Sequence, residues 1–287
     1  MRRVFLGFLV LALVSAGWVV GGLPSRAQVQ ALVQGDPGLT AVMRQREEEA
    51  RRARRPARRV QAWVPISEVS RNLIHAVLAA EDQKFFGHEG VDWDAIKKSV
   101  EVDRARGRLV RGGSTITQQL AKNLFLSTRR SIVRKLRELV VAWWLEADLS
   151  KKRILELYLN VIEWGDGLYG CEAAARRYYG KPSSALDPEE AAGLAGMIPN
   201  PRRINPLVDP RRFSRAQRRV LWLMAHAGYI RGDLAGLGRE PPPPEPAAEE
   251  EEEPPEPIAV PEPTRAPPTT PSPQPSPPAT PATPGVG

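Results

Sequence analysis

Hydrophobic residues recur at helical spacing through most of the middle of the chain. This period predicts helices over residues 66–86, 92–106, 116–125, 130–148, 150–160, 173–178 and 211–226. Asp187-Pro188-Glu189-Glu190 adds another helix start, with an N-cap residue, a proline at the first position and a carboxylate at the third. We find no convincing pair of strands and no repeat, so the sequence predicts an all-α body over residues 63–238.

The helix over residues 130–148 has the clearest amphipathic pattern. One stripe collects its apolar residues, which we expect to face the core: Leu136, Leu139, Val140, Trp143, Trp144 and Ala147. Glu138 lies roughly opposite that stripe, with Arg134 and Lys135 within one turn of it. A solvated ion-pair face and the lining of a cleft both fit this geometry.

The segments outside the body differ in composition. An apolar run over residues 4–23 follows Arg2 and Arg3, which predicts a transmembrane anchor over residues 1–23 with the body exported. A cleaved signal peptide is the alternative. Residues 24–62 are polar and charge-dense, which indicates a helical or disordered stalk, and the Pro- and Glu-rich residues 239–287 are predicted to be disordered.

Charge is distributed unevenly along the chain. The net charge is +8, but the segment from Pro241 carries eight Glu and one Arg, so the remainder holds 40 Lys and Arg against 25 Asp and Glu. Such a basic body indicates an anionic partner: nucleic acid, phospholipid or a phosphate-bearing substrate. The single cysteine, Cys171, excludes an intrachain disulfide, and no His and Cys spacing resembles a structural zinc site.

Two other stretches carry candidate chemistry. On an ideal helix Glu81 lies among Val77, Leu78 and Phe85, while Asp82 points to the polar side. A carboxylate among aliphatic side chains loses hydration, so its pKa rises and it becomes a candidate general acid or base, although a capping or ion-pairing Glu is equally compatible. Residues 111–123 place glycines and hydroxyls at a helix start, where Thr115 and Gln118 fit a capping box. Sugar hydroxyls or phosphate oxygens suit such a helix end, as does an ordinary capped turn.

The order of these motifs resembles the signatures of the peptidoglycan glycosyltransferases, glycosyltransferase family 51. The matching stretches are Glu-Asp-x-x-Phe-x-x-His-x-Gly at 81–90, Gly-x-Ser-Thr-Ile-Thr-Gln-Gln-Leu-x-Lys-Asn at 112–123, Arg-Lys-x-x-Glu at 134–138, residues 150–160 and residues 189–199. The turn at 163–167 is similar to that of the monofunctional branch. The Ser-x-x-Lys and Lys-Thr-Gly elements of penicillin-binding relatives are absent from the sequence, so we expect the monofunctional enzyme.

The resemblance implies a lysozyme-like helical domain at the outer face of the bacterial cytoplasmic membrane. Its substrates would be lipid II and the growing glycan strand, joined by β-1,4 bonds with inversion and release of undecaprenyl pyrophosphate. Glu81 would be the general base, and Glu138 would assist the leaving pyrophosphate directly or through a divalent cation, with no obligatory cofactor. The implied substrate-binding residues are Ser114, Thr115, Gln118, Gln119, Lys122, Arg130, Arg134, Lys135 and Arg137. Membrane lipids and other cell-wall synthesis proteins would be its remaining partners.

Three alternatives stay open at this point. A lytic transglycosylase of similar fold would cleave glycan with one Glu as general acid, without needing Gln118, Gln119 and Lys122. A catalytically dead wall-binding module would not need Glu81 and Glu138. A nucleic-acid binder would explain the positive charge, but the export signal argues against that compartment.

Overall fold

The computed structural model describes residues 5, 17–97, 113–129 and 131–231. All of them lie in one compact unit, Met1–Ala248. Predictions for the tail at 239–287, for most of the anchor and for Arg130 fall outside the described residues. Residues 17–20 are helical, and among the described residues no helix has both the length and the hydropathy needed to cross a bilayer.

The described fold is predominantly helical, as the hydrophobic period predicts. The longer helices are α2 (Arg26–Gln30), α3 (Ala41–Arg52), α4 (Arg71–Glu81), α6 (Ile116–Phe125), α7 (Ile132–Asp148), α8 (Lys151–Val161), α9 (Cys171–Tyr179), α10 (Pro188–Met197) and α11 (Pro210–His226). Short 3₁₀ turns lie between them at η1 (Ala31–Val33), η2 (Ile66–Glu68), η3 (Phe85–Gly87) and η4 (Ser183–Ala185). The range predicted at 116–125 agrees with α6, and the start at Asp187 is confirmed by its capping box with Glu190.

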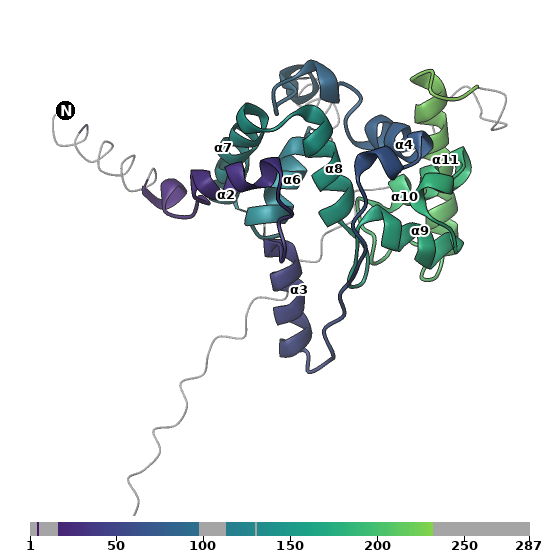
Figure 1. Cartoon of the computed structure of the whole chain (residues 1–287), viewed down its shortest axis with the longest axis horizontal. Coiled ribbons are helices and arrows are strands. Elements are labelled where there is room, and N and C mark those ends of the chain that lie inside the picture. Colours follow the sequence, from purple (N-terminus) through teal and green to yellow (C-terminus); the bar gives the residue numbers. More distant parts are fainter. Residues whose placement is uncertain (1–4, 6–16, 98–112, 130, 232–287) are drawn as a thin grey trace, which may run out of the picture. The chain divides into compact units, whose positions relative to one another are not determined.

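The helices pack as two groups. α4, α10 and α11 contact one another, while α6 contacts both α7 and α8 (Figure 1). Small residues let α10 approach α11 closely: a Cβ placed on Gly196 would lie 2.9 Å from the backbone of Ala216. Glu81 is the last residue of α4 and touches α6, so it lies where the two groups meet.

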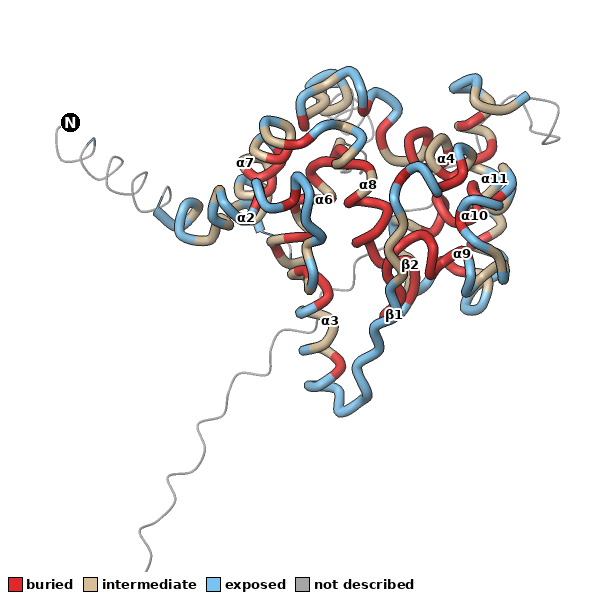
Figure 2. The backbone as a smooth tube through the Cα atoms, viewed as in Figure 1, coloured by how far each residue is buried: buried red, intermediate tan, exposed pale blue. Residues whose placement is uncertain are grey.

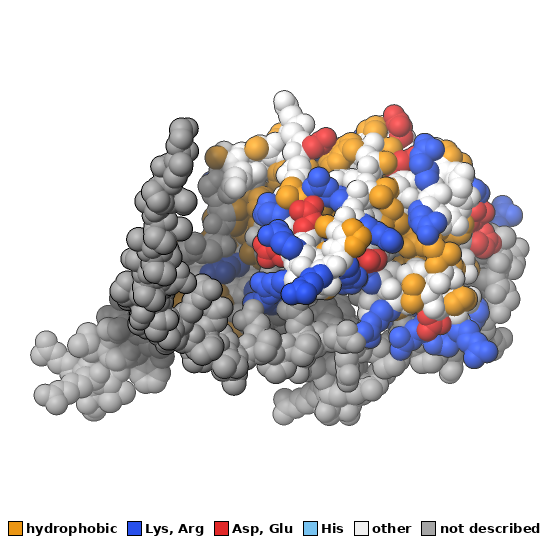
Figure 3. Space-filling view, turned by 90° about the horizontal axis from the view of Figure 1, so that it is seen from below, with side chains coloured by type: hydrophobic (Ala, Val, Ile, Leu, Met, Phe, Trp, Pro, Cys, Tyr) orange, Lys and Arg blue, Asp and Glu red, His pale blue; other side chains and the backbone are white. Residues whose placement is uncertain are grey.

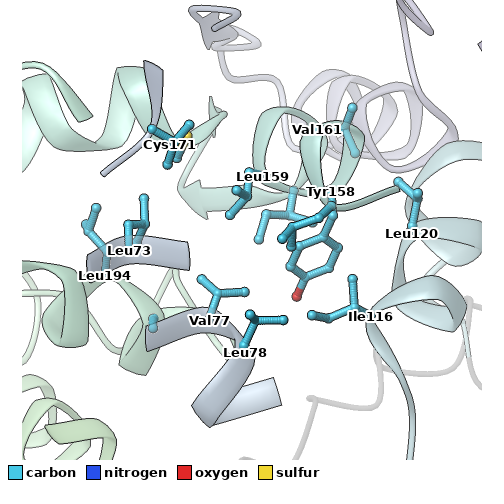
Figure 4. Packing of buried hydrophobic residues seen from close by; sticks show 14 of the residues in the cluster. Leu73, Val77, Leu78, Ile116, Leu120, Tyr158, Leu159, Val161, Cys171 and Leu194 are labelled. Atoms are coloured by element: carbon cyan, nitrogen blue, oxygen red, sulfur yellow. The ribbon is translucent and has the colours of Figure 1, made fainter. Parts of the chain in front are cut away.

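The core runs through both groups (Figure 2). α8 contributes most of its length to it, and Tyr158, Leu157 and Ile154 are fully buried. Figure 4 shows Tyr158 packed with Leu78 of α4 and Ile116 of α6. A continuous core of this kind holds α4, α6 and α8 in fixed register, which positions the residues at their ends.

A small sheet departs from the all-α expectation. β1 (Val60–Gln61) pairs in parallel with β3 (Leu168–Tyr169), and β2 (Glu163–Gly165) pairs with β3 in antiparallel fashion. These strands are two or three residues long, which is too short for the alternation by which strands are recognised in a sequence. The prediction of a body without paired strands is therefore wrong for these short segments.

The segment expected to be a charged stalk is packed against the body. Val29 and Leu32 are buried in the main core, and Met43 of α3 is 1% exposed. On α3, Gln45 exchanges two hydrogen bonds with Thr128, and Arg46 pairs with Glu163 at 3.1 Å. Only part of residues 24–62 therefore behaves as a solvated spacer, because α3 packs on α6 and α2 packs on α7.

The face that α7 buries differs from the predicted stripe, of which Trp144 alone is among the residues packed against the described core. Val141, Ala142 and Leu145 are buried with Glu138, while Leu136 is 45% and Trp143 is 64% exposed. The period correctly separates two faces, but it does not say which of them meets the protein interior. The exposed stripe belongs to the functional argument below.

Candidate active site

Glu81 ends α4 with its carboxylate directed at α6. Its Oε2 accepts a hydrogen bond of 2.7 Å from Nε2 of Gln119. The helix expected over 66–86 is wrong at both ends. α4 begins at Arg71 and ends at Glu81, and the chain turns away at Asp82 with φ of −164°. Phe85 is nevertheless buried nearby in the following turn, so the apolar surroundings predicted for Glu81 are present.

Burial dominates the electrostatics of Glu81. Loss of hydration raises the pKa of this carboxyl above its usual value, and the neighbouring charge of Asp82 adds to that effect. The Gln119 hydrogen bond and the charges of Lys122 and Arg219 lower the pKa and only partly offset it. Sequence reasoning missed the charge of Arg219 on α11, because it is one of several arginines along an amphipathic helix with no motif to mark it.

Asp82 lies inside the protein, which contradicts its expected place on the polar side. It is 8% exposed and accepts hydrogen bonds from the backbone N–H of Ile116 and from Nε2 of His88 at 3.0 Å each. A carboxylate at the first turn of α6 satisfies one of its free N–H groups and complements the helix dipole. Asp82 therefore fixes the start of α6 against the end of α4, one residue from Glu81.

The polar side chains at the start of α6 form hydrogen bonds both within the helix and with other segments. Thr115 caps the helix by accepting from the N–H of Gln118 at 3.2 Å, and its own hydroxyl donates to the carbonyl of Gly90. The Gln118 side chain does not complete the predicted capping box; its Oε1 accepts from Lys135 at 2.9 Å instead. Thr115 was expected to contact substrate, but its hydroxyl forms both of these hydrogen bonds within the protein and the residue is only 3% exposed.

Glu138 forms a buried charged cluster with its neighbours on α7. It is 3% exposed and pairs with Arg134 and with Lys135. Lys135 also donates to Ser114 at 2.9 Å, so the cluster joins the second and third motifs. The alternative of a solvated ion-pair face is excluded by this burial. α6 lies between the two carboxylates, with Gln119 on Glu81 and Gln118 linked through Lys135 to Glu138.

Arg137 points elsewhere. Its guanidinium donates to the carbonyls of Trp18 and Val19, at the end of the N-terminal helical segment. Gly22 lies against the same group: a Cβ there would come within 2.1 Å of the Arg137 Cζ. The structure thus brings Arg134, Lys135, Ser114 and Gln118 together but leaves Arg137 outside that set, while Arg130 lies outside the described residues.

The residues around Glu138 do not fit a protein-held divalent cation. In the described part of the chain no three His, Cys, Asp or Glu side chains come together as metal ligands. Among the described residues Glu138 offers the single carboxylate of its cluster, and cationic side chains hold both of its oxygens. A metal ion there would face two positive groups, so we derive no step through one. What this arrangement offers is a desolvated base and, beside it, cations suited to an anion.

Comparison with known proteins gives consistent matches. A family model described as Transglycosylase matches residues 47–225. A biosynthetic peptidoglycan transglycosylase of Azoarcus sp. (strain BH72) is 49% identical over 209 residues, covering 73% of this chain and 86% of that protein. Proteins of the same description from Dechloromonas aromatica (strain RCB) and Nitrosospira multiformis are 48% and 43% identical, covering 70% and 78% of this chain and 85% and 95% of theirs.

Proposed function

The chain belongs to the family of monofunctional biosynthetic peptidoglycan transglycosylases, and from that premise we propose that it polymerises lipid II into β-1,4 glycan strands with release of undecaprenyl pyrophosphate. It is thus an enzyme of peptidoglycan synthesis, a glycosyltransferase. The observation that carries the finer proposal is the Glu81 carboxylate, desolvated and held by Gln119.

Glu81 acts in this proposal as the general base. It takes the proton from the GlcNAc 4-hydroxyl of the acceptor as that oxygen attacks C1 of the MurNAc at the end of the strand. Inversion at C1 follows, because the pyrophosphate departs from the opposite face. A pKa raised by burial suits this step, since a base whose pKa lies nearer the working pH transfers protons more effectively.

The cluster around Glu138 serves the leaving group. Lys135 and Arg134 neutralise charge that develops on the pyrophosphate oxygens, and Ser114 adds a hydroxyl beside Lys135. Glu138 holds the two cations in place, so that their charge is organised before the reaction starts. Lys122 and the expected Arg130 extend the positive surroundings, and Lys and Arg side chains are spread over the face of the molecule seen in Figure 3.

We place the enzyme at the outer face of the cytoplasmic membrane by a single N-terminal span. The apolar run at 4–23 has the length for it, and α7 offers an apolar face to the same surroundings. Ile132 is 83%, Leu136 45% and Trp143 64% exposed, and Trp18 beside Arg137 is 70% exposed. Exposed apolar side chains on this scale indicate contact with a nonaqueous partner, and a lipid substrate in the bilayer supplies one. Other cell-wall synthesis proteins remain further proposed partners, and nucleic acid is not among them.

A fluorescent label should report this contact. Cys171 is fully buried, so a cysteine introduced at Leu136 can be labelled selectively with an environment-sensitive dye. In the full-length protein in phospholipid vesicles, the Leu136→Cys label should shift its emission to the blue and be quenched by lipids brominated in the acyl chain. Leu207→Cys is the control, because Leu207 is 63% exposed and belongs to the segment between α10 and α11 instead of α7. Equal, water-like emission at both positions would contradict the proposal that the apolar face of α7 contacts lipid.

Purified full-length enzyme given labelled lipid II tests the function itself. We expect long glycan products and undecaprenyl pyrophosphate to appear together, with the polymer degraded by a muramidase. β-Lactams should leave the rate unchanged. Cleavage of isolated glycan without polymerisation would instead identify a lytic enzyme, and binding of glycan without either reaction would identify a wall-binding module.

A further inference from the structure

Tyr158 lies behind the active site in the middle of α8. The residue is fully buried, and its hydroxyl donates a hydrogen bond of 2.9 Å to Oε1 of Gln119. In Figure 4 the hydroxyl is directed into the space between Leu78 and Ile116, toward the ends of α4 and α6. The other end of the same amide, Nε2 of Gln119, donates to Glu81 at 2.7 Å. Tyr158, Gln119 and Glu81 therefore form one chain of hydrogen bonds from the core to the base.

A side-chain amide can offer either its oxygen or its NH₂ group in a given direction. An ionised carboxylate only accepts, so Glu81 needs the NH₂ end of Gln119. Burial, with the charges of Glu81 and Asp82 adding to it, raises the pKa of Tyr158 well above its usual value, so the phenol keeps its proton and donates it. Only one orientation of the Gln119 amide satisfies both neighbours.

We propose that Tyr158 is a positioning residue for the base: by holding the amide oxygen of Gln119, it keeps the amide NH₂ on one oxygen of Glu81 and leaves the other oxygen for the acceptor hydroxyl. The inference rests on the proposed function of Glu81. It deepens that function, because it gives a role to a core tyrosine that touches no substrate.

Removing the Tyr158 hydroxyl has a defined electrostatic sign. With phenylalanine at position 158 the Gln119 oxygen loses its donor, so the amide turns or withdraws from Glu81. A hydrogen bond to the charged form of a carboxyl lowers its pKa, so its loss raises the pKa of Glu81. The other charges facing Glu81 are Lys122 on α6, Arg219 on α11 and Asp82 after α4, and all of them stay.

The test compares Tyr158→Phe with Tyr178→Phe. The Tyr178 hydroxyl donates to the carbonyl of Trp164 at 3.0 Å, so this control also loses one hydroxyl hydrogen bond, but at a site without contact to Gln119. We expect the acid limb of kcat/KM for lipid II polymerisation to move to higher pH in Tyr158→Phe alone. On the acid side its rate should fall about 3- to 10-fold, the worth of one hydrogen bond, and recover at high pH. Loss of rate by the same factor at every pH, or an unchanged profile, would overturn the proposal.

A second measurement does not depend on turnover. In protein labelled with ¹³C at glutamate carboxyls, the Glu81 resonance is identified by its disappearance in Glu81→Gln. Its titration midpoint should rise in Tyr158→Phe and stay in place in Tyr178→Phe; no change in Tyr158→Phe rejects the inference. If Glu81→Gln still polymerises lipid II, the proposed base is wrong, whereas an inactive Glu81→Gln with an unshifted Tyr158→Phe titration rejects only the role of Tyr158.

Discussion

Glu81→Gln should lower kcat for lipid II polymerisation by about 10²- to 10⁴-fold, the usual contribution of a general base. Glutamine keeps the size of the side chain and can still contact Gln119, but it cannot take a proton. In the wild-type enzyme the rate should fall as the pH drops through the raised pKa of Glu81, because only the ionised carboxylate is a base. Steady-state assays over a pH series measure both effects.

The same variant should be no less stable than the wild type at neutral pH. A carboxyl whose pKa is raised on folding favours the folded state below its unfolded pKa, and that contribution is lost as the pH rises through the folded pKa. Above that pH the folded protein carries a desolvated charge, which glutamine removes. Thermal unfolding at pH 7 checks this.

Glu172→Gln supplies the matched control. Burial alone would raise the pKa of Glu172, but the hydrogen bonds from Ser183 and the charge of Arg176 outweigh it and lower the pKa. This carboxylate therefore stabilises the fold above its unfolded pKa, and its removal should lower the unfolding temperature at pH 7 while leaving catalysis intact. An active Glu81→Gln enzyme, or an inactive Glu172→Gln enzyme with a native fold, would contradict the assignment of the base.

Glu138→Gln should impair both stability and activity. Breaking a fully buried ion pair costs about 3–5 kcal/mol; here the Lys135 and Arg134 side chains are 39% and 17% exposed, so we expect a smaller loss of about 1–3 kcal/mol. Unfolding temperatures should fall by about 2–4 °C for each kcal/mol. The rate should fall about 10²-fold, because the cations for the pyrophosphate lose their fixed positions.

A double variant separates the two effects. Glu138→Gln with Lys135→Met removes one of the unpaired cations, so it should recover part of the unfolding temperature. It should not recover polymerisation, because the cation itself is then missing beside Ser114. Recovery of both properties together would show that Glu138 has only a structural role.

The helices were largely predictable because the 3.6-residue period comes from burial of one face. The bounds of α6 and the capped start of α10 followed from local signals alone. The end of α4 did not, since the Asp82 carboxylate there accepts from the N–H of Ile116, 34 residues further on, and a contact of that range leaves no local signal. The apolar face of α7 was visible in the pattern, but whether protein or another medium covers such a face is not encoded in its spacing.

The site was predictable to the extent that it follows from motifs. Desolvation of Glu81 and the closeness of Lys135 to Glu138 were both inferred from helix faces, and the structure confirms them. The long-range interactions were beyond local reasoning: the charge of Arg219 on α11 acts on Glu81, and Tyr158 reaches Gln119 from α8. Each depends on how separate helices cross, which no spacing within one helix specifies.

The contact between Arg137 and the N-terminal segment bears on how the proposed anchor would be joined to the body. The Arg137 guanidinium donates to the carbonyls of Trp18 and Val19. A side chain at Gly22 would displace this guanidinium, so the close contact depends on glycine at that position. A few residues on, Arg26 pairs with Asp148 at the far end of α7. These two contacts fix the described end of the N-terminal segment against α7. With the membrane span proposed above, they would hold the reaction centre at one height over the lipid surface.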